Sequence, residues 1–183
     1  MNKSELDLGE GPIVLKSPDD TVSLRQLTLG DASSLFSLLT SNREHLKRFL
    51  PLYEDNLHSE DLVKIFLESD KYFPNRYRFG IRDGEVLVGM QTLYTRKNTG
   101  EIITWVGAEF SGNDYAVRGR SLILDFAFNT LGLTKLISHV DRRNKAALKS
   151  ISGSNFQRVR ALSIIEFPLQ HFTLPNPNLP PTR

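Results

Sequence analysis

Hydrophobic residues in this chain follow two different spacings, and the changes between them divide the sequence into predicted elements. Alternation of apolar and polar residues predicts strands, whereas apolar residues at i, i+3 and i+4 predict helices with one buried face. In the first part of the chain, the pattern predicts strands at residues 13–15 and 22–27, helices at residues 32–39 and 43–50, and a third helix after residue 59. Asp31 and Ser59 stand immediately before two of these helices, and we expect them to be N-caps.

The second part of the chain predicts a meander followed by alternating helices and strands. Asp83-Gly84 is a strong hairpin signal between strands at residues 77–82 and 86–94, and a further strand is predicted at residues 102–110. The later elements are a helix at residues 115–130 that ends before Gly132, a strand at 135–140, a helix at 144–152 and one long strand at 156–167. Four prolines among the last ten residues predict an irregular tail. The sequence therefore predicts one α+β domain.

Length and charge restrict the organisation and the partners of the chain. Its 183 residues suit one well-buried core, and we expect a flexible N-terminus at residues 1–11, a single domain at residues 12–172 and a proline-rich tail at residues 173–183. The 23 basic and 21 acidic residues give a formal net charge of only +2, which does not make a nucleic-acid footprint. Nucleic acid is therefore not an expected partner.

Scarce residue types exclude further classes of site. The chain has no cysteine, which excludes disulfides, thiolate nucleophiles and zinc sites built on cysteine. Its four histidines (His45, His58, His139 and His171) are scattered along the chain, so no metal site is expected. The polar N-terminal segment lacks the apolar core of a secretory signal, and no apolar run is long enough to cross a bilayer. We therefore expect a cytoplasmic protein without a membrane segment.

Residues 109–124 carry the strongest chemical signal, because a strand pattern runs into a glycine-containing turn and then into an amphipathic helix. The backbone N–H groups and the positive end of the helix dipole at such a turn suit a bound phosphate. Asp114 places a carboxylate where an approaching anion favours glycine. Alternatively, Asp114 caps the helix at residues 115–130, and its carboxylate accepts the first amides and occupies the anion site.

Short motifs stand in a fixed order around this turn. They are Leu24-Arg25 with Asp31-Ala32, Asn42-Arg43-Glu44-His45-Leu46, Gly89, Trp105-Val106-Gly107 and Asn144. In this order and spacing, residues 22–160 resemble the GNAT superfamily of acyl-CoA-dependent N-acyltransferases, in particular the RimJ/RimL-type N-terminal acetyltransferases of ribosomal proteins. The resemblance implies a three-layer fold in which helices flank a mixed sheet that is splayed at its middle. It also implies that the pantetheine arm of acetyl-CoA lies in the splay.

The resemblance further implies a set of residues that bind acetyl-CoA. Members of the superfamily carry the pattern Q/R-x-x-G-x-G/A at the turn, where backbone N–H groups cradle the pyrophosphate. The residues at this turn are Ser111, Gly112, Asn113, Asp114, Tyr115 and Ala116, with Asp114 in place of the second glycine. Other implied contacts come from Arg118, from the backbone N–H groups of Val106 and Gly107, and from Asn144, a catalytic candidate. Arg118 and Asn144 also have structural alternatives, as a solvated helix charge and as a helix N-cap.

Candidate acids and bases are less complete than in the superfamily. The serine that is suggested to protonate the departing thiolate aligns with Ala147, so an acid must come from water or from another side chain, such as Tyr115 or Ser150. As the base that deprotonates the amine, Glu109 at the end of the predicted strand is better placed than Glu101 at its start. The alternative for Glu109 is a solvent-facing carboxylate without a catalytic role.

On the acceptor side, the resemblance places residues 42–49 over the cleft. Arg43, His45 and Arg48 are candidates to hold a polar or acidic peptide, and Trp105 is a candidate wall of the pocket. A solvated helix and a core tryptophan are the respective alternatives. A homodimer formed through the last strand and the tail is also a prediction, whereas the sequence does not identify the acceptor.

Two functions are therefore in competition. The first is an N-acetyltransferase that moves the acetyl group of acetyl-CoA to a primary amine, either a protein N-terminus or a small amine. The attack is direct, because no cysteine is present to form an acyl-enzyme. The alternative is a degenerate member in which Asp114 and Ala147 have weakened or abolished acetyl-CoA binding, and which acts as a ligand-binding or regulatory module. The two hypotheses differ in whether the turn at residue 114 receives a diphosphate.

Overall fold

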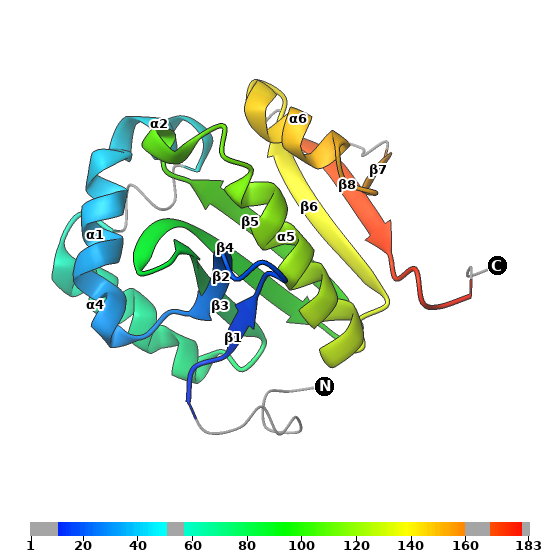
Figure 1. The fold of residues 1–183 in the computed structure, drawn as a ribbon, viewed down its shortest axis with the longest axis horizontal. Coiled ribbons are helices and arrows are strands. Elements are labelled where there is room, and N and C mark those ends of the chain that lie inside the picture. The colour runs from blue at the N-terminus through cyan, green and yellow to red at the C-terminus, as the bar shows by residue number, and fades with distance from the viewer. Residues whose placement is uncertain (1–10, 51–56, 160–168, 181–183) are drawn as a thin grey trace.

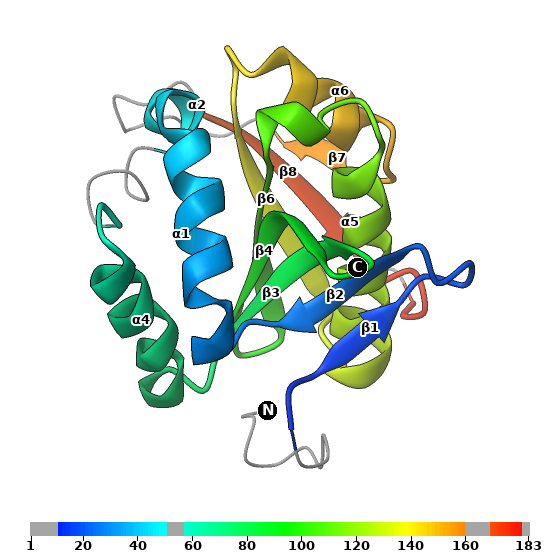
Figure 2. The same cartoon turned by 60° about the vertical axis from the view of Figure 1, so that its left-hand side comes forward.

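The computed structural model describes residues 11–50, 57–159 and 169–180 of the chain. Within these residues, the strands form one eight-stranded sheet that lies between two layers of helices (Figure 1, Figure 2). The strands are β1 (Val14–Lys16), β2 (Val22–Gln26), β3 (Arg76–Asp83), β4 (Val86–Arg96), β5 (Thr99–Val106), β6 (Lys135–Asp141), β7 (Gln157–Val159) and β8 (Leu169–Pro175). The α-helices are α1 (Ala32–Ser41), α2 (Arg43–Phe49), α4 (Glu60–Glu68), α5 (Tyr115–Asp125) and α6 (Lys145–Ser152). The expected three-layer α+β fold is confirmed.

The order of strands in the sheet is β1-β2-β3-β4-β5-β6-β8-β7. All neighbouring strands are antiparallel except β5 and β6, which are parallel. A parallel pair needs a crossover connection, and α5 lies between β5 and β6 in the chain and supplies it. The sheet is therefore mixed, and its parallel junction lies near its middle.

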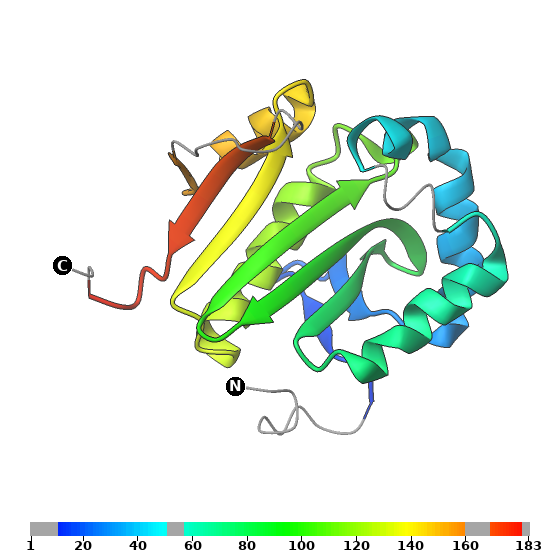
Figure 3. The same ribbon diagram turned by 180° about the vertical axis from the view of Figure 1, so that it is seen from behind.

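Each face of the sheet has its own core, because successive strand residues point to opposite faces. Helices α5 and α6 cover one face, where the core includes Phe79, Ile123, Phe126, Leu136 and Ile151. Helices α1 and α4 cover the other face, where the core includes Leu35, Val63, Met90 and Trp105. Figure 3 shows that the helices of this second layer do not extend over β6 and β8 in the described part of the chain. No described helix is both long enough and apolar enough to span a bilayer.

The strand predicted at residues 102–110 is too long. Strand β5 ends at Val106, and Ala108–Phe110 form a 3-10 turn that leads out of the sheet. The side-chain oxygen of Asn42 accepts the first amide of this turn at 2.7 Å, so that amide is satisfied without a neighbouring strand. The elements predicted before this point are confirmed to within a residue or two, and the hydroxyl of Ser59 caps α4 as expected.

The C-terminal part of the chain departs further from the predictions. The helix predicted at residues 115–130 is α-helical only to Asp125 and closes with a π turn at Phe126–Thr130. The long strand predicted at 156–167 begins as β7, but its residues 160–167 lie outside the described part. Strand β8 pairs with β6 although it contains a proline, because Pro175 is its last residue and interrupts the ladder only there. Three residues assigned to the tail therefore belong to the sheet.

Asp31 stands at the N-cap position of α1, but its carboxylate does not cap this helix. It accepts the backbone amide of Thr28 at 2.8 Å and pairs with Arg25 at 3.0 Å and with Arg82 at 2.5 Å. Burial raises the pKa of Asp31, but the hydrogen bonds from Thr28 and Arg25 and the charge of Arg82 outweigh this effect and leave the pKa below its ordinary value. The expected cap is replaced by a buried ion cluster that joins β2 and β3 to the start of α1.

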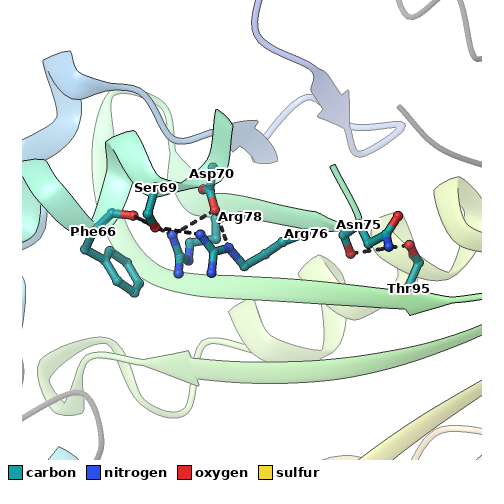
Figure 4. Close-up of polar contacts among 7 residues, drawn as sticks. All are labelled: Phe66, Ser69, Asp70, Asn75, Arg76, Arg78 and Thr95. Atoms are coloured by element: carbon teal, nitrogen blue, oxygen red, sulfur yellow. Dashed lines mark hydrogen bonds and ion pairs between the residues drawn. The ribbon is translucent and has the colours of Figure 1, made fainter. Parts of the chain in front are cut away.

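A second ion cluster joins the end of α4 to β3 (Figure 4). Asp70 pairs with both Arg76 and Arg78, and Arg78 also donates to the carbonyl of Phe66 at 2.7 Å. The guanidinium of Arg78 lies 3.4 Å from the centroid of the Phe66 ring, and Arg76 donates to the hydroxyl of Ser69 at 2.6 Å. These contacts hold the turn after α4 against the sheet.

Candidate active site

The parallel strands β5 and β6 separate before they end. Their pairing runs from Thr99 opposite Lys135 to Ile102 opposite Ser138, whereas β5 continues to Val106 and β6 to Asp141. Figure 3 shows the two strands diverging toward these ends. The backbone groups beyond the last pair therefore border a gap in the sheet, and the expected splay is confirmed.

The register of β4 against β5 determines which backbone groups face this gap. Gly89 lies opposite Val106, and the adjacent amide of Gly107 donates to the carbonyl of Val88 at 2.9 Å. This pattern surrounds a non-hydrogen-bonded antiparallel pair, in which the N–H and C=O of Val106 point away from β4. The same alternation turns the backbone of Thr104 toward the gap. The amide of Val106 thus faces the gap, but the expected role of the Gly107 amide is wrong because that amide is already bonded.

Gly89 allows β4 and β5 to approach each other closely beside the gap. A Cβ atom at this position would lie 2.4 Å from the carbonyl oxygen of Trp105 and 3.0 Å from the Cα of Val106. Trp105 itself is only 5% exposed and packs in the core beneath α1 and α4. It is therefore a core residue and not the pocket wall that the resemblance implied. Its packing holds β5 against this core.

Helix α5 begins at the end of the sheet where β5 and β6 diverge (Figure 1). In the turn before it, Gly112 has a φ of 89° and Asp114 a φ of 54°. The carboxylate of Asp114 caps no amide of α5, and no described residue accepts a hydrogen bond from the amides of residues 112–117. The predicted internal cap is wrong, because an N-cap needs an extended backbone and Asp114 is left-handed. These amides are available to an anion.

The side chains of Arg118 and Tyr115 are engaged by turns of the sheet. Arg118 pairs with Asp19 in the β1–β2 turn, and a hydrogen bond from Ser17, together with the charge of Arg118, holds the pKa of Asp19 at about 2. The hydroxyl of Tyr115 donates to Asp83 at 2.6 Å, and this hydrogen bond raises the pKa of Tyr115. The guanidinium of Arg118 is therefore already paired with a carboxylate, and the hydroxyl proton of Tyr115 is already donated to Asp83.

Helix α6 is capped by Asn144, whose side-chain oxygen accepts the amide of Ala147 at 3.0 Å. The structural alternative for Asn144 is thus observed. Ser150 lies further along α6 and is bonded by Arg120 of α5. The buried guanidinium of Arg120 donates to the carbonyl and the hydroxyl of Ser150 at 2.9 and 3.1 Å. Burial lowers the pKa of Arg120 to about 10. Since the hydroxyl of Ser150 accepts from Arg120, its own proton is available for donation.

Asn42 is a site residue whose role the sequence does not reveal. Its buried carboxamide joins the α1–α2 junction to the turn after β5. The side-chain oxygen accepts the amide of Ala108 at 2.7 Å, and the nitrogen donates to Oε2 of Glu109 at 3.1 Å and to the carbonyl of Leu38 at 3.0 Å. The carboxylate of Glu109 is thereby held beside α2. The sequence motif that starts at Asn42 marks this position, but the motif alone indicates a role for the charged residues that follow Asn42 and not for Asn42 itself.

Helix α2 carries the residues predicted to hold the acceptor, namely Arg43, His45 and Arg48. His45 and Arg48 both pack against the ring of Phe49, at 5.3 and 5.1 Å from its centroid. A hydrogen bond from Arg143 and, more weakly, the charge of Arg48 lower the pKa of Asp141 at the end of β6. Helix α2 therefore lies close to β6 and borders the gap on the side opposite α5 (Figure 2).

Comparison with protein families decides the class of this chain. The family model described as Acetyltransferase (GNAT) domain matches residues 21–156. The chain belongs to the GNAT acetyltransferase family. A sequence comparison with curated proteins finds no match.

Solved structures share the fold of this GNAT chain at low sequence identity. The ribosomal-protein-S5-alanine acetyltransferase from Vibrio fischeri matches with a TM-score of 0.79 at 17% identity, over 92% of this chain and 100% of that one. RimJ from Mycobacterium smegmatis, solved with CoA-disulfide, matches with a TM-score of 0.77 at 18% identity, over 94% and 89%. Spermidine N-acetyltransferase from Vibrio cholerae, solved with CoA and spermine, matches with a TM-score of 0.73 at 19% identity, over 85% and 96%.

GNAT acetyltransferases move the acetyl group of acetyl-CoA to an amine, and this is the activity of the chain. The residues present fit acetyl-CoA, because the splayed strands leave the Val106 amide facing the gap and the first amides of α5 are free of a cap. The alternative of a degenerate binding module gains no support. It rests on Asp114 and Ala147 together, and the first of these fails because the carboxylate of Asp114 caps no amide of α5.

Proposed function

We propose that the acceptor of this acetyltransferase is the α-amine of a polypeptide whose first residues are acidic or polar. The observation that carries the proposal is the charge of α2, which contains Arg43, Lys47 and Arg48 but only one acidic residue, Glu44. A polyamine would be repelled by this helix, whereas peptide carboxylates would be attracted to it. The Vibrio fischeri neighbour is named for an alanine of a ribosomal protein, which supports a polypeptide acceptor.

For acetyl-CoA, we propose two sets of backbone contacts. The diphosphate is held by the turn that contains Ser111, Gly112, Asn113, Asp114, Tyr115 and Ala116, because the amides from residue 112 onward are free and lie at the positive end of α5. The amide of Val106 faces the gap and polarises the thioester carbonyl. Asn144, oriented by its own cap, contacts the pantetheine through its side-chain nitrogen.

Bound acetyl-CoA supplies an activated thioester, so the chain has to position the amine, remove a proton from it and assist the leaving group. Glu109, held by Asn42, is a candidate for attracting the ammonium group. Ser150 is our candidate acid in place of the serine that the family has at Ala147, because its hydroxyl proton is free. No acyl-enzyme forms, since the sequence has no cysteine.

The acceptor can be identified by measuring CoA release with three substrates: a peptide that begins with alanine and continues with acidic residues, its lysine-containing counterpart, and spermidine. We expect kcat/KM for the acidic peptide to exceed the other two by about tenfold or more at low salt, and the preference to shrink as salt screens the charges. The double variant Arg43→Gln with Arg48→Gln should lose this preference.

The matched control is Arg96→Gln, which removes an exposed charge at the end of β4 and should leave the preference unchanged. Equal or faster turnover of spermidine would overturn the polypeptide acceptor, while acetyl transfer itself would stand.

A further inference from the structure

Three strands bring Glu101, His139 and His171 together on the face of the sheet that α5 does not cover. Strand alternation places them there, because their neighbours Ile102 and Phe172 belong to the core beneath α5 and α6. His139 of β6 lies opposite His171 of β8, and Glu101 precedes the last pair between β5 and β6. Histidines that are scattered along the sequence therefore meet where the gap opens.

The geometry of this cluster is that of a histidine oriented by a carboxylate. Nδ1 of His139 lies 2.8 Å from Oε1 of Glu101. The ring of His171 packs edge-on against that of His139, with centroids 4.3 Å apart and an interplanar angle of 87°. The side chains of His139 and Glu101 are 27% and 43% exposed, so a substrate on this face can reach them.

The hydrogen bond also fixes the tautomer of His139. That bond is the main cause that lowers the pKa of Glu101, which is therefore a carboxylate near neutral pH. A carboxylate only accepts hydrogen bonds, so Nδ1 of His139 carries the hydrogen and Nε2 of the neutral ring carries the lone pair. Burial lowers the pKa of His171.

We propose that His139 is the general base that takes a proton from the acceptor ammonium, and that Glu101 is the residue that positions it. The proposal rests on the proposed function and adds the route by which the amine is deprotonated. Glu109, the base expected from the sequence, is already bonded by Asn42. His45 has no carboxylate partner among the described residues and packs on Phe49 instead.

The proton balance of this step is complete. An N–H bond of the ammonium breaks, its electron pair stays on nitrogen, and the proton adds to Nε2 of His139. The imidazolium is stabilised by Glu101 and returns the proton to solvent before the next turnover. The neutral amine forms the new C–N bond, and its second proton leaves with the thiol of CoA. No further reactant is required.

Other ionisable groups on this face come from each neighbouring element. They include Tyr94 of β4 opposite Glu101, Arg76 of β3 opposite Tyr94, Asp141 farther along β6 with its partner Arg143, and Arg48 of α2. Strand alternation puts Arg78 and Arg82 of β3, Arg96 of β4 and Lys135 of β6 on the same face. Arg76 is paired with Asp70, and Asp141 is paired with Arg143. Glu101 is therefore the charge that acts directly on His139.

The test is the pH dependence of kcat for the peptide acceptor at saturating acetyl-CoA. We expect His139→Gln to lower kcat at neutral pH by about 100-fold or more. The acid limb of the profile, which is the fall of kcat toward low pH, should then follow only the protonation of the free amine, whose pKa is about 7.7–8.0. Glu101→Gln should also lower kcat at neutral pH, because the His139 ring loses the carboxylate that orients it, and Glu101→Asp should restore part of the activity. His58→Gln, an exposed histidine before α4, is the matched control and should behave as the unmodified protein.

Two further measurements separate this proposal from the proposed function. NMR of the His139 ring nitrogens in the free protein should show the neutral ring with its hydrogen on Nδ1 in the unmodified protein and a mixture of the two tautomers in Glu101→Gln. Calorimetric binding of acetyl-CoA should be the same in all variants. An unmodified protein that binds no acetyl-CoA, or that acetylates no peptide, would overturn the proposed function. A protein that does both, but in which His139→Gln keeps kcat and its acid limb, would overturn the role of His139.

Discussion

The proposed acetyl-CoA loop is best tested by replacing Asp114 with asparagine and with glycine. Asp114 is exposed, has a φ of 54°, and caps no amide of α5. Asp114→Asn removes the charge but keeps a side chain that tolerates a left-handed backbone, whereas Asp114→Gly removes the charge and the conformational cost together. The two variants therefore separate electrostatic repulsion from backbone strain.

The expected magnitude follows from the charges at this turn. Two unit charges 4 Å apart interact by about 1 kcal/mol in water and by about 4 kcal/mol near a protein surface. Because Asp114 is exposed, the lower end applies, and against a dianionic diphosphate we expect a repulsion of about 1–2 kcal/mol. Asp114→Asn should then bind acetyl-CoA about 5- to 30-fold more tightly at low salt. Asp114→Gly should add up to about 1 kcal/mol to the free energy of unfolding.

Isothermal titration with acetyl-CoA at about 0.01 M and about 1 M salt measures the gain and its screening, since the Debye length falls from about 30 Å to about 3 Å between them. The gain of Asp114→Asn should largely disappear at high salt. Asp125→Asn removes the same charge at the other end of α5 and should leave the affinity unchanged at both salt concentrations. If neither Asp114 variant changes the affinity at low salt, the diphosphate does not lie at this turn.

Three further predictions concern the supports of the site. Asn42→Ala should lower the free energy of unfolding by about 1–3 kcal/mol in urea denaturation, because it leaves a backbone amide without its partner, and kcat should fall with it. Gly89→Ala places a Cβ 2.4 Å from the carbonyl of Trp105, so it should cost about 1–3 kcal/mol and weaken acetyl-CoA binding in calorimetry. Asp31→Asn leaves Arg82 without its buried partner and should cost about 3–5 kcal/mol at neutral pH. Since the folded pKa of Asp31 is lowered, its contribution is complete above the unfolded pKa of about 3.9 and is lost as pH falls through the folded pKa; urea denaturation in acid should show the two proteins converging.

Elements could be predicted where the decisive interactions are local. The hairpin at Asp83-Gly84 and the cap of α4 at Ser59 depend on residues within one turn, and both are where the sequence places them. The failures depend on distant partners. Asp31 gives up its cap to Arg82, 51 residues away, and the strand that ends at Pro175 exists because β6 lies beside it. Propensity at these positions is overruled by tertiary contacts.

The same division holds for the candidate site. The GNAT pattern identifies the turn at residues 111–116, but only the left-handed backbone of Asp114 shows that its carboxylate leaves the amides of α5 free. The amides of Val106 and Gly107 are adjacent in sequence, yet the register against β4 directs one into the gap and bonds the other to Val88. The position of the loop and of the strand can be predicted from the sequence, whereas the direction of each N–H group depends on the pairing of strands in the folded protein.

In the proposed mechanism, the two faces of the sheet divide the reaction between them. Asp114 and the start of α5 lie at one face, Glu101 and His139 point to the other, and the backbone of Val106 lies at the gap between them. No sequence motif could join Glu101 to His139, because their contact depends on β6 pairing with β5 after the α5 crossover. The consequence is separable chemistry. Substitution of Asp114 should change the affinity for acetyl-CoA and leave the pH dependence of kcat in place, whereas substitution of His139 should leave only the pH dependence of the free amine and should not change the affinity.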